Sequence, residues 1–135
     1  GGYLRLRDCE LSSLVYNIPV TNKSVYGLFN EGSGNCEVFG STIRINGAGA
    51  LLATGVYSEG GNVILRHCVI SASDSTRNSA EAYGILGLNS GVPFEAIYAG
   101  ACELYGTDGF GVHQVPGDVV GANCWTAGFD TIPDF

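Results

Sequence analysis

The sequence contains no methionine, few charged residues and few strong helix formers. It opens with Gly1-Gly2-Tyr3, so we expect a processed chain or a piece of a longer protein rather than a complete translation product. Only 14% of the residues are charged, which is low for the surface of a free-standing globular domain. Because 45% are hydrophobic, the 135 residues still supply enough apolar material for the core of one domain.

Clustered positive charge is also missing from the sequence. The six lysines and arginines are scattered along a chain of net charge −7 and pI near 4.5. Nucleic acids and anionic membrane surfaces both require clustered cations, so we expect neither as a partner. No apolar run approaches the ~20 residues of a membrane-spanning helix, so we expect no membrane insertion.

The cysteines match no metal or redox motif. They are Cys9, Cys36, Cys68, Cys102 and Cys124, and no two of them form a C-x-x-C pair. An odd number of cysteines in so short a chain argues against a disulfide framework. We therefore expect buried free thiols, and we expect neither a metal nor a cofactor.

A glycine followed by an aliphatic residue recurs at a nearly constant interval. The pairs are Gly27-Leu28, Gly55-Val56, Gly84-Ile85 and Gly111-Val112, so the steps are 28, 29 and 27 residues. Self-similarity with a period of roughly 20 to 50 residues is the sequence signature of solenoids and other repeat folds.

A second segment follows each of these pairs and places small or apolar residues in four columns. The first two columns are Leu4, Cys36, Val63, Ile97, Val120, and Leu6, Val38, Leu65, Ala99, Ala122. The other two are Cys9, Ser41, Cys68, Cys102, Cys124, and Leu11, Ile43, Ile70, Leu104, Thr126. A spacing of two residues predicts half-buried strands. The wider gap between the second and third columns predicts a bend that keeps both strands facing inward.

Each unit thus holds three short strands, and no segment of helical periodicity separates them. Parallel strands without crossover helices fit a solenoid in which each coil pairs with the next. We predict an all-β parallel β-helix of about five coils over residues 1–126, with 127–135 as a C-terminal cap or a link to a following element. Each column then becomes a ladder of side chains ~4.8 Å apart.

The G-[ILV] strand, the V-x-L-x-x-C-x-I strand pair and the coil length of 22 to 34 residues resemble right-handed parallel β-helices of the pectate-lyase-like type. Within that group the sequence most resembles bacteriophage tailspike and tail-fibre proteins. The resemblance covers residues 3–126 and implies a right-handed coil, a homotrimer and attachment to a cell-surface polysaccharide or another host receptor. No catalytic motif of that group can be placed on this sequence.

Aromatic residues follow the glycine–aliphatic pairs. If Leu28 and its equivalents point inward, then Phe29, Tyr57, Leu86 and His113 point outward in one vertical stripe. Strict alternation would turn Tyr26, Thr54, Tyr83 and Phe110 inward, unless a bend exposes them. Aromatic side chains stack on sugar rings, so Phe29, Tyr57 and His113 are candidate ligand-binding residues. An apolar stripe suits a trimer interface equally well.

Two carboxylates occupy equivalent places in successive coils. Glu31 and Glu59 each precede a glycine after the first strand, and we expect them one rung apart on one outer face. Such spacing suits the catalytic pair of a retaining glycosidase, a ligand contact or a calcium site. The alternative interpretation is two solvated turn residues. Arg7 and Arg66 share a column with Phe39 between them, but no aspartate cluster accompanies them, which disfavours a calcium-dependent lyase.

These observations predict a structural or receptor-binding segment of a phage tail fibre or tailspike in the virion. One alternative is an enzyme, a polysaccharide depolymerase that uses outward-facing Asp or Glu residues. Another is a bacterial surface adhesin on the cell surface or in the extracellular space. The missing catalytic motifs favour a non-catalytic role, because this fold hosts enzymes, adhesins and passive shafts alike.

Overall fold

A computed structural model describes residues 2–13, 24–31, 34–46, 52–73, 81–87, 97–106, 112–114 and 119–126. These residues form strands and no helix, and the strands assemble into three sheets. Sheet A contains β1 (Tyr3–Arg7), β4 (Asn35–Phe39), β7 (Asn62–Arg66), β10 (Ile97–Gly100) and β13 (Val119–Ala122). Sheet B contains β2 (Glu10–Ser12), β5 (Thr42–Asn46), β8 (Val69–Ser73), β11 (Glu103–Gly106) and β14 (Trp125–Thr126). Sheet C contains β3 (Ser24–Asn30), β6 (Leu52–Ser58), β9 (Glu81–Gly87) and β12 (Val112–Gln114).

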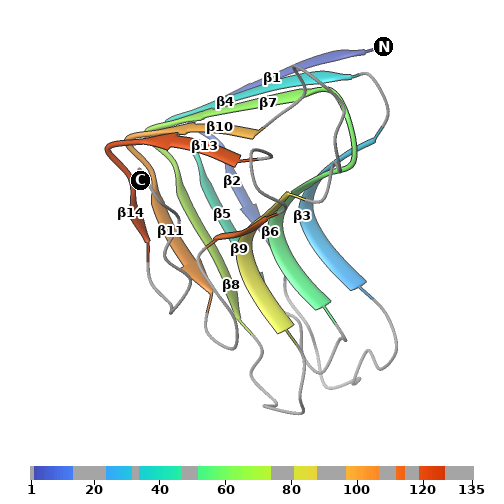
Figure 1. Ribbon diagram of the computed structural model, residues 1–135, viewed down its shortest axis with the longest axis vertical. Coiled ribbons are helices and arrows are strands. Elements are labelled where there is room, and N and C mark those ends of the chain that lie inside the picture. Colours follow the sequence, from blue (N-terminus) through green and yellow to red (C-terminus); the bar gives the residue numbers. More distant parts are fainter. Residues whose placement is uncertain are drawn as a thin grey trace.

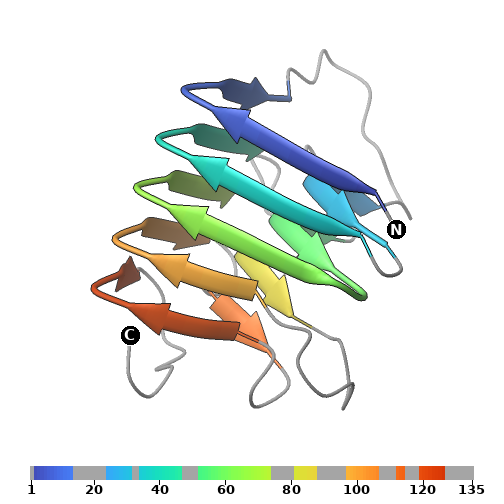
Figure 2. The ribbon, with the colours of Figure 1, turned by 90° about the horizontal axis from the view of Figure 1, so that it is seen from above.

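Every pair of neighbouring strands in the three sheets is parallel. Each of the first four coils adds one strand to each sheet, and the described part of the fifth adds one to sheet A and one to sheet B. In Figure 1 the strands of sheet A lie together at the top, above those of sheets B and C. In Figure 2 the strands of sheet A run from right to left in front, and the chain returns behind them as it descends. This path is right-handed. The predicted right-handed parallel β-helix of five coils is confirmed.

The inward columns form one continuous core between the sheets. Val38, Val63 and Leu65 of sheet A, and Ile43, Ile70 and Leu104 of sheet B, have no exposed surface. Each buried aliphatic side chain of this size stabilises the folded chain by about 1.5–3 kcal/mol relative to full exposure. The core therefore follows the two-residue spacing of the sequence.

The first two columns were misplaced in the last coil. Ile97 pairs with Val119 and Ala99 pairs with Gly121. Val119 and Gly121 therefore continue the two columns, in place of the predicted Val120 and Ala122. Val119 is buried, whereas Val120 is 48% exposed. Only Gly121 keeps the three-residue gap to Cys124 found in the other coils. Because glycine has no side chain, apolarity alone moved the predicted columns by one residue.

A column of left-handed backbone conformations makes the bend between sheets A and B. Its members are Asp8, Gly40, His67, Ala101 and Asn123, with φ between 50° and 56°. Their amides continue the inter-coil ladder; for example, His67 N–H donates to Gly100 O at 3.0 Å and Ala101 N–H donates to Ala122 O at 2.9 Å. Non-glycine residues adopt this conformation at a cost, so the ladder holds the bend in place.

The residue after each bend belongs to the cysteine column. In all five coils its side chain donates a hydrogen bond to the carbonyl two residues earlier: Cys9 to Arg7, Ser41 to Phe39, Cys68 to Arg66, Cys102 to Gly100 and Cys124 to Ala122. A small side chain with one donor meets this requirement, and cysteine and serine both have one. All five cysteines are free, as predicted, and Cys36 is buried in another column.

Glycine is required where sheet C approaches sheet B. A Cβ on Gly55 would lie 2.4 Å from Cγ2 of Ile70 and 2.7 Å from the carbonyl oxygen of Gly84. In β3 the alternation breaks at the equivalent glycine, Gly27, because Val25 and Leu28, three residues apart, both pack on the core. Tyr26 and Tyr83 consequently join a second cluster with Tyr57 and Leu86, apart from the main core. Of the two predicted alternatives, strict alternation is wrong and a break in the alternation turns these side chains away from the main core.

Candidate functional site

The predicted ligand-binding stripe lies on the outer side of sheet C. Phe29 is 43% exposed, whereas Tyr57 is only 8% exposed. The rings of Tyr26, Phe29 and Tyr57 stack with centroids 5.1 to 5.3 Å apart and planes inclined by about 20°. Of this set, Phe29 is therefore the ring most available to a ligand. His113 lies in β12, but its side chain is outside the described residues.

The two candidate carboxylates do lie on successive rungs. Asn30 pairs with Ser58, and the amide of Glu59 donates to the carbonyl of Asn30 at 2.9 Å, which places Glu59 beside Glu31. Both side chains are exposed. Oε1 of Glu59 accepts a 2.6 Å hydrogen bond from the hydroxyl of Tyr57. One carboxylate of the pair is thus already engaged by the aromatic stripe.

The outer face of sheet A gathers a different set of side chains, which alternate with the inward columns. We call it the arginine–aromatic face, and its members are Tyr3, Arg5, Arg7, Glu37, Phe39, Ile64, Arg66, Tyr98, Gly100, Val120 and Ala122. The strand register sets them in two long rows across the coils. One row runs Arg5, Glu37, Ile64, Tyr98, Val120, and the other runs Arg7, Phe39, Arg66, Gly100, Ala122. Neighbours within a row are one strand spacing, ~4.8 Å, apart.

Phe39 lies between two arginines on this face. The guanidinium carbon of Arg7 is 5.2 Å from the centre of the Phe39 ring, and that of Arg66 is 5.9 Å from it. These distances are within the range of cation–π attraction. The predicted shared column of Arg7 and Arg66, with Phe39 between them, is confirmed.

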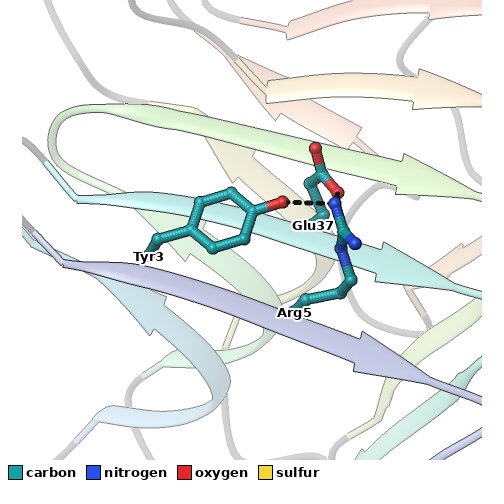
Figure 3. Close-up of polar contacts among 3 residues, drawn as sticks. All are labelled: Tyr3, Arg5 and Glu37. Carbon is teal, nitrogen blue, oxygen red and sulfur yellow. Dashed lines mark hydrogen bonds and ion pairs between the residues drawn. The ribbon is translucent and has the colours of Figure 1, made fainter.

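A third arginine has polar partners on the same face (Figure 3). Arg5 donates to Oε2 of Glu37 at 3.0 Å and to the hydroxyl of Tyr3 at 2.8 Å. Two hydrogen bonds raise the pKa of Arg5, and the one to Tyr3 has a larger effect than the one to Glu37. The hydrogen bond from Tyr3 and the charge of Arg5 hold the pKa of Glu37 below its usual value. Glu37 stays ionised at neutral pH and offsets one of the three positive charges.

Beyond Arg66 the second row ends in Gly100, which has no side chain, and Ala122, which has only a methyl group, and a depression lies there. This open hollow of ≈ 390 Å³ has Arg66 and Tyr98 on its rim. Its volume lies at the lower end of the range of small-molecule sites. Exposed apolar surface is present too, because Tyr98 is 39% exposed and Val120, its neighbour in the first row, is 48% exposed.

The fold therefore concentrates cations that are scattered in the sequence. Of the four arginines and lysines that lie in the described residues, Arg5, Arg7 and Arg66 are on this face, and Arg44 pairs with Glu10 on sheet B at 3.6 Å. The expectation that the chain has no basic patch is wrong for the face, although the net charge of the whole chain is −7. The alternation of the V-x-L strands is the sequence feature from which the shared face of these arginines could have been predicted.

Other kinds of site find no support in the described part of the chain. No group of three or more His, Cys, Asp or Glu side chains there is arranged to hold a metal ion. The same residues contain no helix long and apolar enough to cross a membrane. Comparison with protein-family models, with curated proteins and with solved structures finds no match.

Proposed function

We propose that this chain is the receptor-binding segment of a phage tail fibre or tailspike, and that its arginine–aromatic face attaches to a cell-surface polysaccharide. The observation that supports this most is the set of exposed rings on the outer face of sheet A. Tyr3 is 59% exposed and Tyr98 39% exposed, and both project from strands that are fixed by pairing in the solenoid.

The physical argument starts from the chemistry of sugars. A sugar ring has an apolar face that stacks on an aromatic ring, and hydroxyl groups that accept hydrogen bonds from arginine. The face offers both kinds of group on successive coils, with rings on β1, β4 and β10 and arginines on β1 and β7, so an extended chain of sugars could contact several of them. A sheet also presents these groups with little conformational freedom to lose on binding.

The same proposal includes a homotrimer. Its contact between copies is the outer side of sheet C around Phe29 of the predicted stripe and the neighbouring ring of Tyr26. Stacked rings around an exposed Phe29 are the kind of apolar surface found at such interfaces. Light scattering on the chain and on Phe29→Ser tests it. A trimer that Phe29→Ser dissociates supports the contact, and a monomeric parent chain contradicts it.

Binding to immobilised cell-surface polysaccharides, measured by biosensor, tests the attachment proposal. We expect Tyr98→Ala to weaken binding about tenfold, because the loss of one exposed ring that packs on a sugar removes roughly 1.4 kcal/mol of binding free energy. Trp125→Ala is the matched control, since Trp125 is a similarly exposed ring on sheet B. Equal losses for Tyr98→Ala and Trp125→Ala would contradict the assignment to sheet A.

A glycan-cleaving hydrolase is the second candidate, favoured by the position of Glu31 and Glu59 on successive rungs. Release of reducing ends from a polysaccharide, lost in Glu59→Gln and kept in Glu103→Gln, would support it. An equal rate of reducing-end release by both variants would contradict the hydrolase proposal. A bacterial surface adhesin would use the arginine–aromatic face in the same way as a tail fibre, and the gene's neighbours in its genome separate the two.

A further inference from the structure

We infer that the ligand of the arginine–aromatic face is an acidic polysaccharide, whose carboxylate or sulfate groups bind Arg7 and Arg66. The inference rests on the proposed function and names the class of glycan. Its basis is the unequal engagement of the three arginines on sheet A, together with the depression beside one of them.

Arg5 differs from the other two arginines in its partners. Its guanidinium is shared between Glu37 and the hydroxyl of Tyr3, so its charge and two of its donors are already used. Arg7 and Arg66 instead lie over the ring of Phe39, and neither has a carboxylate oxygen of the described residues within ion-pair distance. The charge of Arg66 acts on Glu37 only as the weakest of the causes that lower the pKa of that carboxyl group. Packing on a ring uses the flat face of a guanidinium, which leaves its N–H donors for a bidentate anion.

The charge of the face is opposite to that of the chain. Three arginines and the single carboxylate of Glu37 leave two positive charges in excess on the outer side of sheet A. A chain of net charge −7 repels a polyanion at long range, so an acidic ligand is favoured only where such an excess is local. Attraction of this kind is screened over about 8–10 Å at physiological ionic strength, which makes binding sensitive to salt.

The depression gives the anion site a neighbouring place for the sugar ring. Arg66 and Tyr98 line it together with Gly100 and Ala122, whose small size leaves room beside the guanidinium and the ring. A Cβ on Gly100 would meet nothing closer than 3.9 Å, so the backbone does not need glycine there. A larger residue at position 100 would fill the hollow without straining the strand.

The test uses three probes with one backbone: dextran, carboxymethyl dextran and dextran sulfate, each immobilised on a biosensor. We expect both acidic forms to bind at least about tenfold more tightly than dextran, with affinity falling as salt is raised. Arg7→Gln and Arg66→Gln should each lose about tenfold on the acidic probes, Gly100→Val should also weaken them, and Arg44→Gln on sheet B should not. Far-ultraviolet circular dichroism verifies that each variant folds.

Three outcomes would overturn the inference. The first is equal affinity for dextran and its acidic forms. The second is an equal loss for Arg44→Gln and Arg66→Gln, which would indicate a general charge effect. The third is tighter binding of a DNA duplex than of any acidic dextran. If neutral glycans bind through Tyr98 without preference for acid groups, the inference fails and the attachment proposal stands; if no polysaccharide binds, both fail.

Discussion

The hydroxyl of Tyr57 donates a 2.6 Å hydrogen bond to Oε1 of Glu59, two residues further along the chain. The ring of Tyr57 is nearly buried against Tyr26 and Phe29, whereas Glu59 is exposed. The pair therefore connects the aromatic stripe of sheet C to one of the two candidate carboxylates. Burial of the ring is the main cause that raises the pKa of Tyr57, and the hydrogen bond to Glu59 is the second cause.

This raised pKa predicts a loss of stability at alkaline pH that depends on Tyr57. A phenol whose pKa is higher in the folded state contributes stability that is complete below the unfolded pKa of about 10 and is lost as pH rises through the folded pKa. We expect the free energy of unfolding to fall above about pH 10, and to fall less steeply in Tyr57→Phe. Urea unfolding at a series of pH values measures both slopes. Indistinguishable slopes would show that Tyr57 titrates normally.

Gly55→Ala should destabilise the solenoid by about 1–3 kcal/mol or more, because the new methyl group would overlap Ile70 and the carbonyl of Gly84. Gly100→Ala is the matched control, since its Cβ would make only ordinary contacts at 3.9 Å. We expect that control to be neutral or slightly stabilising. Thermal unfolding compares the two, and a tolerated Gly55→Ala would disprove the close approach of sheets B and C.

The left-handed bend predicts opposite effects for one substitution at two neighbouring sites. Ala101 has a φ of 51°, so Ala101→Gly should remove conformational strain and raise stability by about 0.5–1 kcal/mol. Ala99 lies in the extended strand β10 and is buried, so Ala99→Gly should cost about 1 kcal/mol. Chemical denaturation measures both changes. If Ala101→Gly destabilises as much as Ala99→Gly, the bend carries no strain.

Two buried cysteines should differ in the replacements that they accept. The thiol of Cys68 donates to the carbonyl of Arg66, and Ser41 makes the same bond one rung away, so Cys68→Ser should cost less than Cys68→Val. Cys36 stacks on Val63 in an apolar column, so Cys36→Val should cost less than Cys36→Ser.

Differences of about 1–2 kcal/mol in opposite directions are expected for these two pairs of variants. Denaturant midpoints at one temperature are sufficient to compare them. A preference for valine at both positions would mean that the hydrogen bond to the bend carbonyl contributes little, and a preference for serine at both would contradict the apolar character of the Cys36 column.

The stacking of the coils was predictable because it depends on periodicity that is local to each segment. Leu6, Val38 and Leu65 repeat at the same place in their units, and a two-residue spacing turns them to one side. The last coil shows where this reasoning fails, since the backbone register and not apolarity places Gly121 in the column. The same reasoning left open whether Tyr26 points inward, and the close packing at Gly27, where the alternation shifts, decides that it does not join the main core.

The repeat in the sequence was enough to predict the strands, the stacking of the coils and the inward columns of the first four coils, because burial of apolar side chains at a fixed spacing selects one pairing of each coil with the next. Packing in three dimensions fixed the contacts and the exposure of the outer side chains, which alternation along the strands does not give. Arg7, Phe39 and Arg66 are separated by about one coil of chain each, and they meet because parallel pairing in register brings equivalent positions within a few ångströms. Burial of Tyr57 beside an exposed Phe29 likewise depends on packing between coils.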